Sequence, residues 1–247
     1  MKRLTTPALA AAVLAAGPAL AEDVSYDYEG TALTGYFAKA ENPQGLVIIA
    51  HDWDGLDDFE RGQADELAEM GYDAFALSMY ADDTPLEGME DYRAATQEVT
   101  SDRTRMQGLI EAGVTQARDL SDAEQMIVMG YCFGGGVALE MARSDMADMA
   151  AGYATFHGTL ATPEGESYDG EEPPILILHG GADQAVPMSD VVALSEELEA
   201  AGNTYTIEVY SGAPHAFSVE GSDSYQERAA TESWQAFTDF AAERFGS

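Results

Sequence analysis

Short apolar, β-branched runs alternate with amphipathic segments along almost the whole sequence, and this alternation limits the folds that the chain can adopt. The run 45–51 (GLVIIAH) is short and is typical of a parallel strand covered on both faces. The next segment, 59–72, has apolar residues at helical spacing and ends at a glycine. Further strands are expected at 73–80, 125–131, 152–158, 174–181 and 205–212, and further helices at 88–120, 137–144, 188–201 and 223–244.

Strands that alternate with helices in this way form βαβ units. We therefore expect an α/β fold with a mostly parallel central sheet and helices on both faces. The opening stretch, 23–39, is expected to form an antiparallel hairpin at one edge. In such sheets the functional groups lie on loops after the carboxyl ends of strands, so those loops are where a site is expected.

Residues 1–21 have the pattern of a secretory signal peptide: a basic start, an alanine-rich apolar middle and Ala-Leu-Ala before Glu22. A membrane anchor is the alternative, but Gly17 and Pro18 break an apolar run that is shorter than the roughly 20 residues of a span. The expectation is an exported protein of a bacterial periplasm, with one domain over 22–247. The single cysteine excludes a disulfide within the chain.

The charge of the chain is extreme, with 45 acidic and 11 basic residues and a net charge of −34. Such a surface repels nucleic acid and anionic membranes, so neither is an expected partner. Acid-rich surfaces suit concentrated salt, which screens self-repulsion, and a halophilic or marine source is one hypothesis. The alternative is an acidic periplasmic protein that does not depend on salt. A small molecule is the expected partner, and a monomer or weak homo-oligomer the expected state.

The stretch 130–136 (GYCFGGG) lies between an expected strand and an expected helix and contains Cys132. Gly-x-Cys-x-Gly in a strand–turn–helix context is the cysteine form of a nucleophile elbow. Glycines flank the nucleophile at two residues' distance because side chains there would collide in the sharp turn. The helix start also favours a thiolate. The alternative is a buried structural cysteine, as most free cysteines are.

A cysteine nucleophile needs a base and an acid that orients the base. Asp183 follows the strand 174–181, and His215 follows the strand 205–212, so nucleophile, acid and base occur in the chain order of α/β hydrolases. Taken singly, the aspartate suits a turn and the histidine a polar loop. An oxyanion hole is expected from the backbone N–H groups of Trp53 and Phe133.

The remaining aromatic and histidine residues near the strand ends have less specific roles. Trp53, Tyr80 and Phe217 are expected to line a substrate pocket, although core packing is the alternative. His51 is expected to make structural hydrogen bonds, and His157 is a weaker candidate for the base than His215. The histidines and the cysteine lack the spacing of a metal site, and no metal or other cofactor is expected.

These motifs resemble the dienelactone hydrolase family of α/β hydrolases. GYCFGGG, HGGADQAVP (179–187) and GAPHAF (212–217) match it, as does the stretch 50–80, and the resemblance extends from about residue 24 to 244. It implies the α/β-hydrolase fold, a triad of Cys132, His215 and Asp183, and oxyanion donors at the Trp53 and Phe133 amides. It further implies that Asp52, where the family usually has glutamate, contacts the resting thiol and controls its ionisation.

The resemblance is weaker for the substrate. Enzymes that act on dienelactones hold the substrate carboxylate with arginines, one of them four residues after the catalytic histidine, where this chain has Val219. Arg93, Arg103 and Arg105 occur where a second arginine would fall. The expected activity is therefore that of a carboxylic ester hydrolase acting on a small neutral ester or lactone. The alternatives are a peptidase or polyester hydrolase, a non-catalytic binding protein of the same fold, or a thiol sensor, which would need a resolving cysteine.

Overall fold

The protein is described by a computed structural model whose described residues are 20–246. The predicted signal peptide, 1–21, lies outside these residues except for Leu20 and Ala21, which begin the first strand. The strands are β1 (Leu20–Tyr28), β2 (Thr31–Lys39), β3 (Leu46–Ala50), β4 (Asp73–Leu77), β5 (Met126–Tyr131), β6 (Gly152–Phe156), β7 (Ile175–Gly180) and β8 (Tyr205–Tyr210). The helices are α1 (Asp58–Glu69), α2 (Met89–Ser101), α3 (Arg103–Leu120), α4 (Phe133–Ala142), α5 (Met188–Ala201) and α6 (Glu227–Phe245), with a short 3₁₀ turn at Ala147–Met149.

The strands form one eight-stranded sheet in the order β1-β2-β4-β3-β5-β6-β7-β8. β2 runs antiparallel to both of its neighbours, and β3 to β8 pair in parallel. The predicted α/β-hydrolase fold and the antiparallel edge hairpin are confirmed. The chain leaves β3 toward β4 and then crosses to β5 on the other side of β3, so the carboxyl ends of β3 and β5 form a topological switch point, where ligands bind in open α/β sheets.

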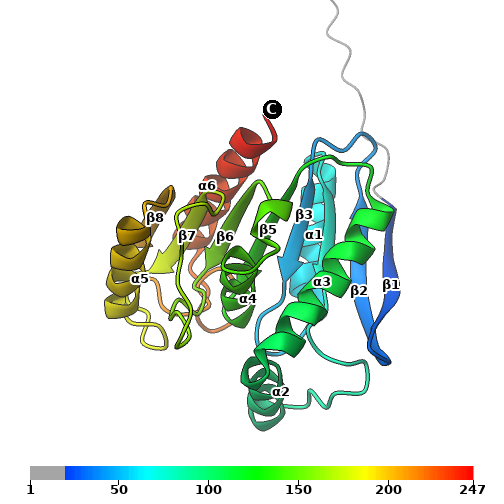
Figure 1. Ribbon diagram of the computed structural model, residues 1–247, viewed down its shortest axis with the longest axis horizontal. Coiled ribbons are helices and arrows are strands. Elements are labelled where there is room, and N and C mark those ends of the chain that lie inside the picture. The colour runs from blue at the N-terminus through cyan, green and yellow to red at the C-terminus, as the bar shows by residue number, and fades with distance from the viewer. Residues whose placement is uncertain (1–19, 247) are drawn as a thin grey trace, which may run out of the picture.

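Two apolar layers hold the helices on the sheet (Figure 1). Side chains of α2, α3, α4 and α5 pack with one face of the strands, and those of α1 and α6 pack with the other. The five residues of β3 and of β4 are all buried, as expected for strands covered on both faces. No helix within residues 20–246 has both the length and the apolarity needed to cross a bilayer.

Three helix boundaries differ from the prediction. The segment 88–120 is divided at Asp102, whose side chain accepts the Arg105 N–H and caps α3. α4 begins at Phe133 instead of 137, because the glycines that suggest a turn are helical residues pressed against neighbouring backbone. α6 begins at Glu227, later than predicted.

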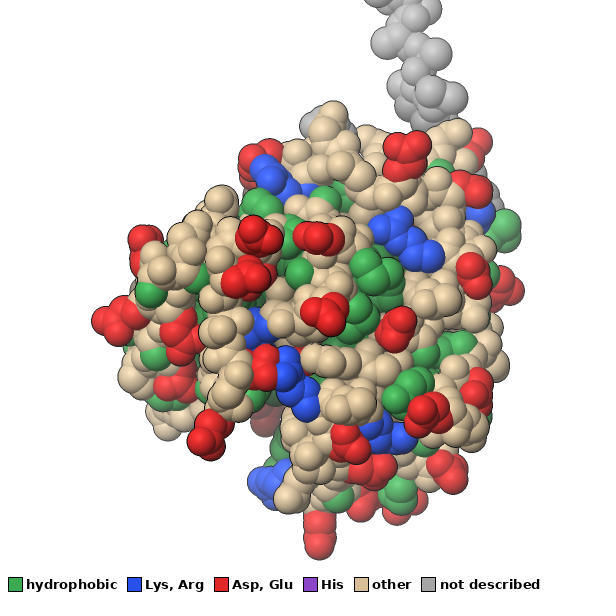
Figure 2. All heavy atoms as spheres, viewed as in Figure 1, with side chains coloured by type: hydrophobic (Ala, Val, Ile, Leu, Met, Phe, Trp, Pro, Cys, Tyr) green, Lys and Arg blue, Asp and Glu red, His purple; other side chains and the backbone are tan. Residues whose placement is uncertain are grey.

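Acidic side chains are spread over the face of the molecule seen in Figure 2, with the basic side chains dispersed among them. The basic residues that form ion pairs do so with single carboxylates or small groups of them, such as Arg228 with Glu232 and Arg61 with Asp23. With 45 acidic residues against 11 basic ones, most carboxylates have no cation to pair with. The surface is therefore strongly self-repulsive unless salt screens it.

Candidate active site

Cys132 lies at the sharp turn between β5 and α4, with φ 49° and ψ −111°. The turn depends on the glycines two residues to either side. A Cβ on Gly130 would lie 2.0 Å from the carbonyl oxygen of Gly134, and a Cβ on Gly134 would lie 2.1 Å from that of Ala50. The Cys132 N–H donates to the carbonyl of Phe156, which fixes the turn to β6. The sequence therefore holds Cys132 in a strained conformation, with its side chain at the carboxyl end of the central strand β5.

The structure brings Cys132, His215 and Asp183 together. His215 Nε2 lies 3.1 Å from Cys132 Sγ, and His215 Nδ1 lies 2.8 Å from Asp183 Oδ2. The other carboxylate oxygen of Asp183, Oδ1, accepts the N–H groups of Ala185 and Val186 at 2.8 and 2.9 Å. The Asp183 side chain is fully buried and that of His215 is 24% exposed. The acid is thus fixed by its own loop, and the imidazole bridges the acid and the thiol.

The electrostatics favour the ionised forms of His215 and Asp183. Burial alone would lower the pKa of His215, but its hydrogen bonds with Asp183 and Cys132, together with their charges, raise it to about 10. Burial alone would raise the pKa of Asp183, but hydrogen bonds from His215 and Val186 outweigh it and the pKa is lowered. At neutral pH, His215 is an imidazolium beside an ionised Asp183. Such an arrangement can stabilise a thiolate nucleophile.

Backbone strain is concentrated around this centre. Four non-glycine residues in the described part of the chain have positive φ; besides Glu29 in the β1–β2 turn, they are Cys132, His157 and Ala216. His157 directly follows the last residue of β6, and Ala216 directly follows His215. Strain of this kind persists only where the surrounding structure holds it, and it is frequent at functional sites.

His157 packs against the imidazole of His215. Its ring packs edge-on against the ring of His215 at a centroid distance of 5.2 Å, and its Nε2 lies 2.8 Å from Ser218 Oγ. Burial first, then the charge of His215, lower the pKa of His157 to about 3, so it stays neutral. The sequence ranked His157 below His215, and it gave no signal for Ser218 apart from its place three residues after His215.

The two predicted oxyanion donors lie on segments that follow neighbouring strands, β5 and β3. Phe133 is the first residue of α4, so its N–H has no partner within the helix. Trp53 follows β3, where His51 fixes the loop: His51 Nδ1 donates to the carbonyl of Asp52 at 2.6 Å, and its Nε2 accepts the Met79 N–H at 3.0 Å. Because burial lowers the pKa of His51 to about 4, the ring is neutral, as these two bonds require. His51 is structural, as predicted.

Tyr80 is buried and contacts both Trp53 and Phe133, and the pocket role expected of Tyr80 and Trp53 stays a prediction. The Tyr80 hydroxyl donates to the Trp53 carbonyl at 3.0 Å, and its ring stacks on Phe133 at a centroid distance of 5.8 Å. Trp53 is half-buried and packs edge-on against Tyr92. Tyr80 therefore holds both the loop that carries Trp53 and the side chain of Phe133.

Phe217 is a correction to the prediction. Its side chain is completely buried, and it packs against His157 and Tyr210 in the apolar layer beneath α6. It therefore lines no open pocket. The Phe217 carbonyl accepts the Gln226 N–H at 2.9 Å, so the backbone at 217 is held against the residue that precedes α6.

The Asp52 side chain forms a hydrogen bond within its own turn and none with the thiol of Cys132. Its Oδ1 accepts the Asp54 N–H at 3.0 Å, within its own turn, and the hydrogen bond to Sγ comes from His215. A side chain one methylene shorter than glutamate closes this local turn. Burial first, and then Asp54, raise the pKa of Asp52 to about 9. The backbone N–H of Asp52 donates to Glu60 Oε1 at 3.3 Å, which ties the oxyanion loop to α1.

The three arginines singled out in the sequence have different places. Arg93 is exposed, and its guanidinium lies 5.9 Å from the centroid of the Trp53 ring. Arg103 instead bonds Glu140 and Glu166, and Arg105 lies on the same helix, α3. Arg93 alone of the three is beside the predicted oxyanion loop.

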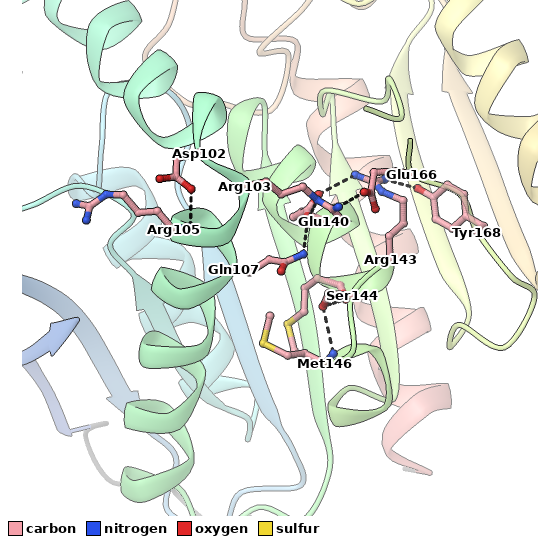
Figure 3. A network of polar contacts seen from close by, with 11 residues as sticks. Asp102, Arg103, Arg105, Gln107, Glu140, Arg143, Ser144, Met146, Glu166 and Tyr168 are labelled. Carbon is pink, nitrogen blue, oxygen red and sulfur yellow. Dashed lines mark hydrogen bonds and ion pairs between the residues drawn. The ribbon is translucent and has the colours of Figure 1, made fainter. Parts of the chain in front are cut away.

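A network of ion pairs and hydrogen bonds, partly buried, holds α4, the helix that begins directly after Cys132 (Figure 3). Glu140, on α4, accepts from Arg103 at 2.5 Å and from Gln107 at 2.8 Å, both on α3. Arg143 reaches the other oxygen of Glu140 at 3.4 Å and donates to Tyr168 at 2.8 Å. The network therefore joins α4 to α3 and to the 164–168 segment. It fixes the helix whose first turn supports the nucleophile.

Comparison with known proteins identifies the family of the chain. The profile of the Dienelactone hydrolase family matches residues 33–245. The carboxymethylenebutenolidase of Pseudomonas putida is 28% identical over 226 residues, which cover 88% of this chain and 93% of that protein. Among solved structures, the protein called m3DLH superposes with a TM-score of 0.83 at 26% identity, covering 93% of this chain and all of that one.

A second solved structure is the dienelactone hydrolase-like promiscuous phosphotriesterase P91 from metagenomic libraries. It has a TM-score of 0.79 at 26% identity and covers 92% of this chain and 99% of its own. The similarity to these two solved structures extends over 93% and 92% of this chain.

Proposed function

The chain belongs to the dienelactone hydrolase family of carboxylic ester hydrolases, and we propose that it cleaves a small neutral ester or lactone through a thioester at Cys132. The observation that carries the proposal is the continuous contact from Sγ to His215 Nε2 and from Nδ1 to the buried Asp183 carboxylate, at 3.1 and 2.8 Å. No resident cofactor takes part in the proposed reaction.

The first half of the reaction forms the acyl-enzyme. His215 holds the proton of the Cys132 thiol, and the thiolate attacks the substrate carbonyl carbon. The carbonyl electrons move onto oxygen, where the N–H groups of Trp53 and Phe133 stabilise the negative charge. The tetrahedral species collapses when the imidazolium of His215 gives its proton to the leaving alcohol oxygen, which leaves a thioester.

The second half releases the acid. His215, now neutral, takes a proton from water, and the hydroxide attacks the thioester carbonyl. Proton transfer from water has already made His215 an imidazolium, so collapse of this second tetrahedral species expels the Cys132 thiolate, releases the acid and restores the thiolate–imidazolium pair. Asp183 orients the imidazole with Nδ1 as donor and stabilises its positive charge in both halves.

A neutral substrate fits the residues around the centre. Val219 stands where dienelactone-cleaving relatives have an arginine, and Arg103 is engaged by Glu140 and Glu166. The acidic surface further disfavours an anionic substrate.

A carboxylate-bearing lactone is the second candidate substrate, and one observation favours it. Arg93 lies over the ring of Trp53 and is exposed. The name of the Pseudomonas putida relative, carboxymethylenebutenolidase, indicates such a substrate for that protein. A neutral aryl ester and a dienelactone distinguish the two. If the second candidate is right, Arg93→Gln lowers kcat/KM for the dienelactone alone; if the first is right, the neutral ester is preferred and the substitution changes little.

The experiment that tests the covalent mechanism is acyl trapping on Cys132. A p-nitrophenyl ester is mixed with the protein, the reaction is quenched in acid, and the intact mass is measured. An added acyl group that is absent in Cys132→Ala, together with loss of turnover in that variant, is the expected result. Turnover of Cys132→Ala at the wild-type rate would exclude the covalent mechanism, and absence of turnover in the wild-type protein would favour the non-catalytic or sensor alternatives. Hydrolysis of peptides or polyesters in preference to small esters would favour a peptidase or a polyester hydrolase.

Export to a periplasm and adaptation to salt remain part of the proposal. The pattern of residues 1–21 supports export, and the excess of 45 acidic over 11 basic residues supports a salty environment. Mass spectrometry of the mature N-terminus tests the first, with a start at Glu22 expected.

A further inference from the structure

A cavity of about 670 Å³ lies beside the catalytic centre, between α1, α6 and the loop after His215. These two helices cover the same face of the sheet (Figure 1). Tyr131 and Phe156, the last residues of β5 and β6, line it, so it opens near the carboxyl ends of the strands. Ser218 lines it too and bonds His157, which contacts His215. The cavity is therefore a neighbour of the site, and of the loop that carries Trp53 only the last residue, Asp57, lines it.

The lining combines aromatic rings with carboxylates. Aromatic residues make up five of its sixteen residues, against 9% of the whole chain. They are Phe59, Tyr131, Phe156, Tyr225 and Trp234. Tyr131 and Phe156 are each only 1% exposed, so the rings accessible to a ligand are those of Phe59, Tyr225 and Trp234. Four more are acidic, namely Asp57, Asp58, Glu66 and Glu220, and none of the sixteen is Lys, Arg or His.

The carboxylate nearest the rings is held in place by one of them. The indole N–H of Trp234 donates to Glu66 Oε1 at 2.7 Å, which fixes the carboxylate at the edge of the indole. The neighbouring cations are engaged outside the cavity: Arg61 bonds Asp23, and Arg228 bonds Glu232. The charge of the lining acids is therefore not neutralised from within the cavity.

We propose that this cavity binds an organic cation: a quaternary or protonated ammonium group on an apolar body. Aromatic faces attract such a cation through their quadrupoles, and the surrounding carboxylates add charge attraction. An anion would meet four carboxylates and no base. A purely apolar ligand would contact the rings but would gain no charge attraction from the carboxylates.

Benzyltrimethylammonium is the probe, and its binding is followed by tryptophan fluorescence without turnover. The outcome is therefore independent of the ester hydrolysis proposed above, and Cys132→Ala binds as the wild type does. The chain has two tryptophans, so Trp53→Phe leaves Trp234 as the sole reporter. The expected result is a saturable fluorescence change in Trp53→Phe. A change confined to Trp234→Phe, in which Trp53 reports, would place the cation elsewhere and overturn the proposal.

Charge variants separate this cavity from the general attraction of an acidic surface. Glu66→Gln and Glu220→Gln are each expected to weaken binding by about three- to five-fold. Glu196→Gln removes the same charge from an exposed position of α5, on the other face of the sheet, and is the matched control. Equal weakening in all three variants, or equal affinity for the neutral analogue benzyl alcohol, would mean that no specific cation site exists.

Discussion

Asp183→Asn tests how the acid of the triad acts. The asparagine keeps Oδ1 in place to accept the Ala185 and Val186 N–H groups, so the loop is retained. At the other position an NH₂ group replaces Oδ2, 2.8 Å from His215 Nδ1. An amide that donates to Nδ1 leaves the proton on Nε2, which then cannot accept one from Cys132. The substitution thus removes a charge and reverses the tautomer without changing the shape of the site.

The size of the effect follows from the pKa of His215. Its rise from 6.5 to about 10 corresponds to about 5 kcal/mol of preference for the imidazolium. Because the His215 side chain is only 24% exposed, solvent screening removes a minor part of this free energy. Asp183 and Cys132 together provide the preference for the imidazolium. If they contribute about equally, loss of the carboxylate charge costs about 2–3 kcal/mol and lowers the alkaline limb of activity by about two pH units.

The assay is kcat/KM for a p-nitrophenyl ester between about pH 6 and pH 11, corrected for spontaneous hydrolysis. The wild type should keep its activity until His215 loses its proton near pH 10. Asp183→Asn should fall about 100-fold at pH 8, with its alkaline limb at lower pH. Glu196→Gln, an exposed acid on α5, should match the wild type. A folded Asp183→Asn with an unchanged limb and unchanged kcat would refute the assigned role of the carboxylate.

Four further predictions concern the scaffold. Gly134→Ala should destabilise the protein by about 3 kcal/mol in urea, because its Cβ would lie 2.1 Å from the Ala50 carbonyl oxygen; wild-type stability would contradict the elbow geometry. Glu140→Ala leaves the guanidinium of Arg143, 3% exposed, without a carboxylate, and should cost about 3–5 kcal/mol, measured in the same way with Glu196→Gln as control. Burial first raises the pKa of Glu60 to about 8, so its stabilising contribution is complete below about pH 4.5 and is lost as the pH rises through 8; urea titrations at several pH values should show this decline, and Glu60→Gln should reduce it. Finally, Tm should rise between about 0.1 M and 1 M KCl, where the Debye length falls from about 10 Å to about 3 Å; an unchanged Tm would remove the halophilic hypothesis.

Local pattern was sufficient to predict most of the fold. The runs that became β3, β5 and β7 are apolar on both faces, and only a parallel sheet covered by helices buries both. Helix boundaries were less predictable because glycine has two uses. Gly134 suggests a turn by its lack of propensity, yet it lies in α4, where close contact with the Ala50 carbonyl requires the missing side chain.

The candidate site was partly predictable for a similar reason. Cys132, Asp183 and His215 each follow a strand, and parallel strands deliver their following loops to one edge of the sheet. The sequence therefore predicted which residues meet there. It did not predict where neighbouring side chains point: Phe217 enters the core, and Asp52 closes its own turn.

The sequence by itself determined the layered architecture and the convergence of three chemical groups, because periodicity and chain order are local properties. Only the tertiary structure decided the distances within the triad, the support of His215 by His157 and Ser218, and the aromatic cavity between α1 and α6. These features depend on segments remote in sequence, such as Glu66 and Trp234, whose contact arises from the packing of two helices on one face of the sheet. Pairing of that kind is fixed by packing geometry, which no local pattern encodes.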